Sequence, residues 1–182
     1  GTLRAWGLND HGQLGNGTTT DSNVPVLSGA QIGIRSIAAG THHSVGVADD
    51  GTLWAWGSDY YGELGNGSYP ASDVPMQVEQ LTGIVAVSAG QDYSVAVKND
   101  GTVWACGNNE WGQLGNGTIT NSDVPVQVSL LSGMMSIASS WNHSLAIKND
   151  GTVWTWGWGL FGELGNGTNA LFGPLPVQVS SQ

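Results

Sequence analysis

The chain repeats itself every 50 residues. The tripeptide Gly-Thr-Leu or Gly-Thr-Val begins at residues 1, 51, 101 and 151. The octapeptide HGQLGNGT at residues 11–18 has close copies at 61–68, 111–118 and 161–168. A Val-Pro pair follows at residues 24, 74 and 124, and its fourth copy, Leu175-Pro176, comes one residue late, so the loop before it carries an insertion. A constant period predicts one structural unit per repeat, with apolar surface buried between neighbouring units.

Each repeat predicts four short strands. In one repeat the first two cover residues 34–39 and 44–48, and the next two repeats have counterparts at the same spacing. An Asp-Gly pair follows at residues 50–51, which predicts a hairpin turn with both residues at positive φ. The third strand covers residues 52–56 and the fourth covers 74–78. Because the proline in the fourth strand cannot donate a ladder hydrogen bond, we expect that strand at a sheet edge.

The third strands have no polar face. Residues 52–56 read TLWAW, with Leu53 and Ala55 on one side and the two tryptophans on the other. A small sheet with two apolar faces needs cover on both sides. We therefore predict an all-β fold, a β-propeller of four-stranded blades, with a solenoid of β-arches as the structural alternative. Residues 1–182 form a single partial propeller of about three and a half blades: a half blade (1–28) and repeats 29–78, 79–128 and 129–182.

The LGNG loop joins the third strand to the fourth in every repeat. Its leucine, Leu14 in the first copy, is expected to fill the gap between adjacent blades. Its glycines, Gly15 and Gly17, are expected at positive φ, which Asn16 also tolerates. The loop recurs because every blade has to make the same turn.

Charge and cysteine content exclude several classes of partner and site. The net charge is −10, and the Lys and Arg residues are Arg4, Arg35, Lys98 and Lys148. Nucleic acids and anionic membranes require basic protein surface, so we expect neither as a partner, whereas a basic partner fits. The single Cys106 excludes an intrachain disulfide and a cysteine-based zinc site. No apolar run reaches about 18 residues, so no membrane insertion is expected.

The unit AAGTHHSVGVADDGTLWAWGSDYYGELGNG at residues 38–67 resembles the repeats of the regulator of chromosome condensation family. The family pattern runs from a Gly-x-x-His-Ser segment through Asp-Gly and Trp-Gly to Gly-Gln-Leu-Gly. The matching positions are Gly40, His43, Ser44, Asp50, Gly51, Trp56, Gly57, Gly62, Leu64 and Gly65. Tyr93, Cys106 and Ser140 depart from the pattern at positions that we expect to be structural. The resemblance implies a β-propeller, which has seven blades in the family.

The resemblance leaves the function open, because the family includes a nucleotide-exchange factor that binds chromatin and a secreted β-lactamase inhibitor. The acidic composition argues against chromatin binding, and the regular spacing leaves no room for the wedge that the exchange factor inserts. Gly1 falls within a hairpin turn of the repeat, and the blade count is half of a seven-bladed ring. We therefore expect an oligomer, in which two copies close one ring, or part of a longer chain or assembly.

No constellation of residues points to catalysis. His43 and His143 share one repeat position, where we expect a structural histidine bonded to strand backbone, and the aspartates beside glycine are expected to serve turns. Glu63 and Glu163 stand where other copies have Gln, which indicates a tolerant position. No nucleophile elbow, phosphate-binding loop or zinc signature occurs. We predict no enzymatic activity, no cofactor and no metal site.

Positions that differ between the repeats mark a candidate partner-binding surface. One cluster lies at residues 9–11, 59–61, 109–111 and 159–161, and the other at 41–42, 91–92 and 141–142. Such loops gather at one face of a propeller, and aromatic residues dominate binding hot spots. The candidate residues are His11, His42, Tyr60, Tyr61, Asp92, Glu110, Trp111, Trp141, Trp158 and Phe161. The ring-bearing position 11, 61, 111 and 161 has inter-blade packing as its alternative role.

These observations predict a non-catalytic module for protein–protein interaction or assembly, which displays aromatic and acidic loops to a protein partner or to other copies of itself. The alternative is a structural subunit of a larger extracellular assembly, joined through open blade edges. An inhibitor-like binder of a secreted enzyme and a nucleotide-exchange factor are less favoured. Low Lys content with many Ser, Thr, Asn and Gly residues indicates a bacterial extracellular or cell-surface protein, with the cytoplasm as the alternative.

Overall fold

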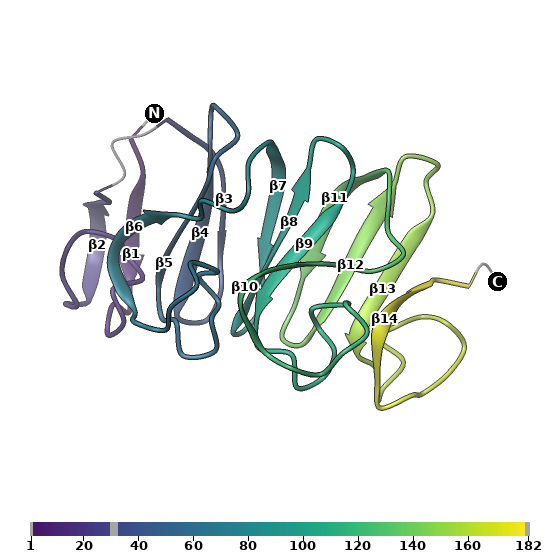
Figure 1. Ribbon diagram of the computed structural model, residues 1–182. Coiled ribbons are helices and arrows are strands. Elements are labelled where there is room, and N and C mark those ends of the chain that lie inside the picture. Colours follow the sequence, from purple (N-terminus) through teal and green to yellow (C-terminus); the bar gives the residue numbers. More distant parts are fainter. Residues whose placement is uncertain (1, 30–32, 181–182) are drawn as a thin grey trace.

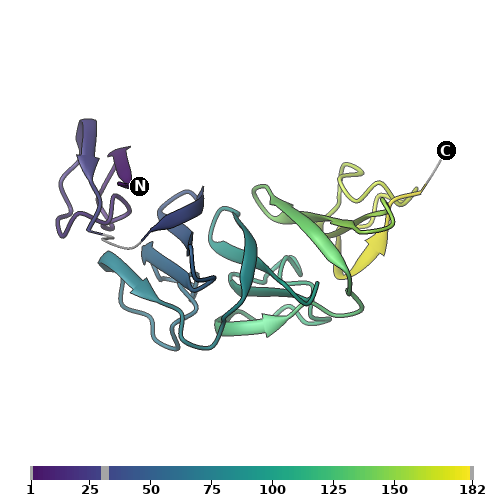
Figure 2. The same ribbon diagram turned by 90° about the horizontal axis from the view of Figure 1, so that it is seen from above.

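The computed structural model describes residues 2–29 and 33–180, which form fourteen β-strands in four sheets (Figure 1). The first sheet has two strands and the other three have four strands each. Seen from above, the sheets stand side by side along an arc (Figure 2). This arrangement confirms the predicted β-propeller blades, and we name the sheets the half blade and blades 2, 3 and 4 in chain order.

The strand bounds follow the repeat. The half blade contains β1 (Arg4–Gly7) and β2 (Ser22–Leu27). Blade 2 contains β3 (Ile34–Ala39), β4 (His43–Ala48), β5 (Leu53–Gly57) and β6 (Ser72–Gln77). Blade 3 contains β7 (Ile84–Ala89), β8 (Tyr93–Lys98), β9 (Val103–Gly107) and β10 (Ser122–Gln127). Blade 4 contains β11 (Met134–Ser139), β12 (His143–Lys148), β13 (Val153–Trp158) and β14 (Phe172–Gln178).

Each four-stranded blade is an antiparallel meander with its first strand innermost. The order in blade 2 is β3-β4-β5-β6, and blades 3 and 4 have the same order. The first strands pack across the blade boundaries, with β7 against β3, β4 and β11. The proline-bearing strands β6, β10 and β14 lie at the outer edge, as predicted from the donor that proline lacks. No helix in the described part of the chain has the length and apolarity to cross a bilayer.

The core lies between the blades rather than within one sheet. One cluster joins Val45, Leu53 and Leu64 of blade 2 to Ile84 and Ala96 of blade 3. A second cluster joins blade 3 to blade 4 in the same way. The LGNG leucines are all buried, which confirms their predicted place; they are Leu14, Leu64, Leu114 and Leu164. Each blade therefore supplies half of a core that its neighbour completes.

The hairpin turns differ from the prediction of two residues at positive φ. Gly51 has φ of 83°, but Leu130 is the one non-glycine residue at positive φ within residues 2–29 and 33–180, so Asp50 is not in that region. The loop has three residues, since Ala48 N donates to Thr52 O at 3.0 Å and Gly51 N donates to Ala48 O at 2.9 Å. A three-residue hairpin loop needs only its last residue at positive φ. Asp50 instead accepts hydrogen bonds from the backbone and hydroxyl of Thr52.

The LGNG turn uses its two glycines as predicted and its asparagine differently. Gly15 has φ of 67° and Gly17 has φ of 78°. A Cβ built on Gly15 would lie 2.8 Å from Nε1 of Trp56 in the next blade, so both the backbone and the close approach require glycine here. Asn16 lies outside the positive-φ region and contributes its side chain, which accepts hydrogen bonds from the backbone and hydroxyl of Thr18.

Candidate functional site

The loops that join the first strand to the second and the third to the fourth leave each sheet at the same end. Connections in an antiparallel meander alternate between the two ends of the sheet, so these loops share one face of the molecule. Backbone hydrogen bonds connect them across blades, from Thr41 N to Gln91 O at 3.2 Å and from Gln91 N to Trp141 O at 3.1 Å. All ten candidate residues belong to these loops or to the strand ends beside them, and we call this surface the loop face.

The long loops of the half blade and of blades 2 and 3 are each fixed to the following blade. The carbonyl of Gln13 accepts hydrogen bonds from Ser44 Oγ and from Trp56 Nε1, both at 2.9 Å. In the next repeat the carbonyl of Glu63 accepts from Ser94 Oγ at 2.7 Å. The loops therefore bridge blades, and their side chains are held on a rigid support.

The repeat position of Glu63, which the exchange of Glu and Gln between copies indicated to be tolerant, is buried in the first three repeats. Glu63 is buried, and its carboxylate accepts hydrogen bonds from Ser58 Oγ at 2.7 Å and from Tyr61 N at 2.8 Å. Gln113 is also buried; it accepts from Trp111 N and donates to Asn108. Glu63 thus accepts a hydrogen bond from Ser58, whereas Gln113 donates one to Asn108 at the equivalent position.

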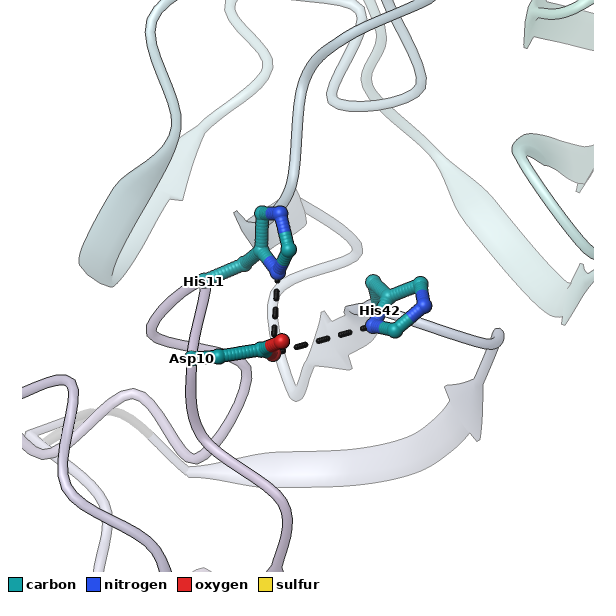
Figure 3. Close-up of side chains that lie close together, drawn as sticks. All are labelled: Asp10, His11 and His42. Carbon is teal, nitrogen blue, oxygen red and sulfur yellow. Dashed lines mark hydrogen bonds and ion pairs between the residues drawn. The ribbon is translucent and has the colours of Figure 1, made fainter.

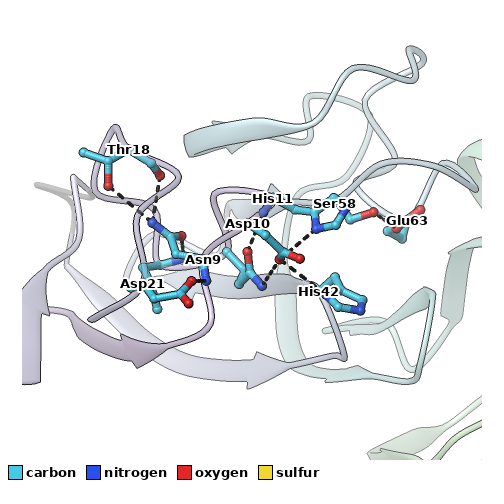
Figure 4. A network of polar contacts seen from close by, with 10 residues as sticks. Asn9, Asp10, His11, Thr18, Asp21, His42, Ser58 and Glu63 are labelled. Atoms are coloured by element: carbon cyan, nitrogen blue, oxygen red, sulfur yellow. Dashed lines mark hydrogen bonds and ion pairs between the residues drawn. The ribbon is translucent and has the colours of Figure 1, made fainter. Parts of the chain in front are cut away.

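The first residue of the cluster at 9–11, and its counterparts in the next two repeats, are likewise structural, although the sequence placed them in the candidate surface. Asn9 is buried, and its Nδ2 donates to the carbonyl of Thr18 at 2.8 Å (Figure 4). The same Nδ2 also donates to the carbonyl of Thr20 at 3.0 Å, so Asn9 ties the loop together. Asn109 repeats these contacts in blade 3. Asp59 stands at the same position and is also buried. Its Oδ1 accepts from Leu64 N, whereas its Oδ2 has no hydrogen-bond partner among the described residues.

At the junction between the half blade and blade 2, Asp10, His11 and His42 come together (Figure 3). Nδ1 of His11 lies 2.9 Å from Oδ1 of Asp10, and Nδ1 of His42 lies 3.7 Å from the same oxygen. The two imidazole centroids are 5.0 Å apart. Hydrogen bonds from Gln13 and from His11 lower the pKa of the Asp10 carboxyl. One potential ligand atom from each of the three side chains lies within 4.8 Å of the others.

The junction between blades 2 and 3 places Tyr60, Tyr61 and Asp92 near one another. The Tyr60 ring is 78% exposed and meets the half-buried Tyr61 edge to face, with 4.8 Å between the centroids. Burial and the neighbouring Glu63 carboxylate raise the pKa of Asp92. Burial followed by the charge of Asp92 raises the pKa of Tyr61.

The junction between blades 3 and 4 has the most aromatic surface. Trp111 packs edge to face on Trp158, with 4.5 Å between the ring centroids. Together with Trp141, Phe161 and Glu163 they line a cavity of about 540 Å³, a size typical of ligand and side-chain pockets. Trp141 is 70% exposed and Phe161 is 82% exposed, so two rings of the cavity rim face solvent. Glu110 lies beside Trp111 on the exposed surface.

The ring-bearing position therefore has mixed roles. His11 and Trp111 contact rings of the following blade, at His42 and Trp158. Phe161 belongs to blade 4, the last blade of this chain, and has no following blade within the chain to pack against. Inter-blade packing explains Trp111 and leaves Phe161 as exposed apolar surface.

The repeat position of His43 and Tyr93 connects each blade to the next through buried hydrogen bonds. His43 is buried, and its Nε2 lies 3.0 Å from Ser94 Oγ of the next blade rather than on strand backbone as the sequence suggested. Burial lowers the pKa of His43 to about 4. Tyr93, which stands at the same repeat position, reaches Ser144 Oγ at 2.9 Å.

Charge is unevenly distributed between the two ends of the sheets. The four Lys and Arg residues lie at or near strand ends opposite the loop face: Arg4 and Arg35 near the starts of β1 and β3, Lys98 and Lys148 at the ends of β8 and β12. The loop face carries the carboxylates of Asp10, Asp92, Glu110 and Glu163. The loop face thus combines tryptophan and tyrosine rings with negative charge.

Comparisons with known proteins agree with the repeat architecture. The Regulator of chromosome condensation (RCC1) repeat matches residues 1–47, 50–97, 100–147 and 150–182. The chain is 47% identical over 53 residues to the ultraviolet-B receptor UVR8 of Arabidopsis thaliana, which covers 28% of this chain and 12% of the receptor. It is 51% identical over 47 residues to the human E3 ubiquitin-protein ligase HERC2, which covers 25% of this chain and 1% of the ligase.

Solved propellers match over nearly the whole chain. Human WBSCR16 superposes with a TM-score of 0.84 at 25% identity, covering 97% of this chain and 47% of its own. Prp20p of Saccharomyces cerevisiae superposes with a TM-score of 0.83 at 22% identity, covering 100% of this chain and 47% of its own. The chain thus spans about half the length of these structures and a far smaller share of the two curated relatives. The repeat matches and the blade architecture together show that the chain belongs to the regulator of chromosome condensation (RCC1) repeat family.

Proposed function

We propose that this chain is a non-catalytic protein-binding module whose loop face takes a partner with a basic surface. RCC1-repeat propellers are commonly protein-binding modules; Prp20p is described with binding to Gsp1p and histones, and yeast RCC1 is described bound to Kap60. Those partners belong to the yeast protein. For this chain, the observation that supports the proposal is the joint presence of exposed aromatic rings and carboxylates on a face where no Lys or Arg stands.

The chemistry of the loop face favours cationic side chains. An Arg or Lys head group over a tryptophan face gains about 0.5–2 kcal/mol, and a nearby carboxylate adds to the attraction. The cavity lined by Trp111, Trp141 and Trp158 has Glu163 in its wall. With the net charge of −10, the loop face would also raise the association rate with a basic partner, in a salt-dependent manner.

The rigidity of the loops supports binding at a low entropic cost. Their carbonyls are bonded to the next blade, and the buried Glu63 and Gln113 side chains bond within their own loops, so little conformational freedom is left to lose on binding. Among the titratable groups, His43 and Cys106 are buried between blades and out of reach of a substrate. The absence of enzymatic activity, the bacterial source and the extracellular location stay predictions.

A selection from a random peptide display library, with the chain immobilised, tests the proposal without knowledge of the partner. We expect enriched peptides to contain Arg or Lys next to aromatic residues. We expect their affinity to fall about tenfold or more in the Trp141→Ala variant, the size of a binding hot spot, and to fall with added salt. The Asp50→Asn variant is the matched control, because Asp50 is an exposed carboxylate at the opposite end of the sheet. Enrichment without basic residues, or binding that Trp141→Ala leaves unchanged, would contradict the proposal.

A second candidate function, assembly through an open blade edge, has its own observation. Within the described residues β1 pairs with β2 and with no other strand. Trp6 is 63% exposed, Ile37 is 58% exposed, and both line a groove of about 400 Å³ between β1 and blade 2. The other blades carry two inner strands at the corresponding place. We infer that the groove accepts an inner strand pair supplied from outside residues 1–182.

The topology disfavours closure of one ring by two copies of this chain, which the sequence had suggested. Two copies would bring two outer strand pairs, β1 and β2 from each, and neither would bring the inner pair that a complete blade needs. The inner pair of another blade fits better. Because the repeat is in register, a copy of residues 129–150 placed directly before Gly1 would complete the half blade.

This extended chain provides the test. We expect a higher unfolding temperature, weaker quenching of Trp6 fluorescence by acrylamide and less self-association in light scattering than for residues 1–182. A control extension with the same residues in scrambled order should have none of these effects. If the in-register extension leaves Trp6 as accessible as before, the groove is not a strand-pair site.

A further inference from the structure

We propose that Asp10, His11 and His42 form a binding site for a divalent transition-metal ion of the zinc class, at the junction of the half blade with blade 2. This inference is independent of the proposed partner binding. Two imidazoles and one carboxylate are a common protein ligand set for Zn²⁺, which leaves a fourth position for water. The sequence predicted no metal site, because it contains no zinc signature.

The geometry is close to that of a coordinated ion. The Nδ1 atoms of His11 and His42 both face the Asp10 carboxylate, at 2.9 and 3.7 Å from its Oδ1 (Figure 3). Metal–ligand bonds of about 2.0–2.2 Å in a tetrahedral site separate ligand atoms by roughly 3.3–3.5 Å. Since the three ligand atoms lie within 4.8 Å of one another, small side-chain rotations would suffice.

His42 provides an observation that points to a ligand. Its Nδ1 is covered from solvent and has no hydrogen-bond partner among the described residues. A buried ring nitrogen without a partner loses its hydration without compensation. A metal ion between His42 and Asp10 would satisfy this nitrogen.

Hydrogen bonds already position Asp10 and the two loops that carry the three side chains. Gln13 Nε2 donates to Asp10 Oδ1 at 3.1 Å, an outer contact of the kind that orients metal-binding carboxylates. The carbonyl of Gln13 is fixed on blade 2 by Ser44 and Trp56. On the other side, the carbonyl of His42 accepts a hydrogen bond from Ser58 N at 2.8 Å.

The repeat shows that the fold does not require these three residues. Tyr60, Tyr61 and Asp92 occupy the corresponding positions at the next junction, and Glu110, Trp111 and Asn142 occupy them at the third. Both junctions have the same backbone arrangement without the two histidines. The ligand set is therefore a local property of the first junction, where the ion would also connect the half blade to blade 2.

Isothermal titration of the chain, produced without a polyhistidine tag and stripped with a chelator, tests the site. We expect one Zn²⁺ per chain, with the mass measured by light scattering unchanged at saturation, and no heat from Mg²⁺ or Ca²⁺, which prefer oxygen ligands. We also expect the unfolding temperature to rise with Zn²⁺ concentration, because the ion binds the folded chain.

The repeat supplies variants that the fold accepts. His11→Tyr and His42→Asn copy residues from the other junctions, and each should weaken Zn²⁺ binding by about tenfold or more, while circular dichroism at 25 °C stays unchanged. His143→Gln, which removes a histidine elsewhere, should leave the affinity within about twofold. No binding at millimolar Zn²⁺, one ion shared between two chains, or full affinity in both His11→Tyr and His42→Asn would overturn the proposal.

Discussion

Replacement of Asp59 by asparagine should stabilise the chain, and the gain should grow with pH. Asn9 and Asn109 occupy the same repeat position, and Nδ2 of each donates to two loop carbonyls. By the repeat, the carbonyls that face Asp59 belong to Ser68 and Pro70. An ionised carboxylate offers them no donor, and its Oδ2 is buried without a partner. Burial raises the pKa of Asp59 to about 7.

The magnitude follows from this pKa. The unfolded chain has an Asp pKa near 3.8, so the folded state binds more protons than the unfolded state between pH 4 and 7. The stabilising contribution of protonated Asp59 is complete below about pH 4 and is lost as the pH rises through about 7. About three pKa units correspond to about 4 kcal/mol. We take half, about 2 kcal/mol, because the loop lies near the surface and water screens part of the charge.

Thermal unfolding of the wild type and Asp59→Asn, followed by circular dichroism at pH 4.5 and pH 8, measures the effect. At pH 8 we expect Asp59→Asn to unfold about 4–8 °C higher than the wild type, and at pH 4.5 the difference should nearly vanish. The reasoning fails if the asparagine variant is less stable at pH 8, or if its gain is the same at both pH values.

Two further predictions concern contacts between blades. Among the described side chains, Trp156 Nε1 alone donates to the Gln113 carbonyl, whereas Trp56 Nε1 and Ser44 Oγ both donate to the Gln13 carbonyl. Because Trp156→Phe leaves its carbonyl without a side-chain donor, it should lower the free energy of urea unfolding by about 1 kcal/mol more than Trp56→Phe. Equal losses would refute this difference. The pKa of His43 is lowered to about 4 by burial, so the contribution of His43 to stability should be constant above about pH 6.5 and fall by up to about 3 kcal/mol as the pH drops towards 4. His43→Tyr, which copies the next repeat, should reduce this slope; an unchanged slope in equilibrium unfolding would contradict the assignment.

The strands and the blade order could be predicted from sequence because the 50-residue period fixes which segments are equivalent. Leu14 and Gly15 were assigned correctly because a single turn recurs in every copy. The hairpin turn was misjudged, since Asp-Gly fits two loop lengths and only the pairing register separates them. These features are local to each repeat, and the comparison of several copies shows which residues recur in all of them.

The side-chain roles were harder to predict because they depend on distances between blades. Asn9 and Glu63 vary between copies, yet both are buried and bonded. The Glu63 position is polar in all four copies and the Asn9 position in the first three, a signal of a structural role that the variation between copies concealed. The meeting of Asp10 with His42 depends on how the half blade docks on blade 2, which no local pattern encodes.

The indole N–H signals of the nine tryptophans, followed by ¹H–¹⁵N NMR while a selected basic peptide is added, test the account most directly. Trp111, Trp141 and Trp158 lie on the loop face, whereas the indoles of Trp54, Trp104 and Trp154 donate to threonine hydroxyls at the opposite end of the sheets. We predict shifts of the first three signals and constant positions for the second three. Shifts confined to the second set, or spread equally over both, would contradict binding through the loop face.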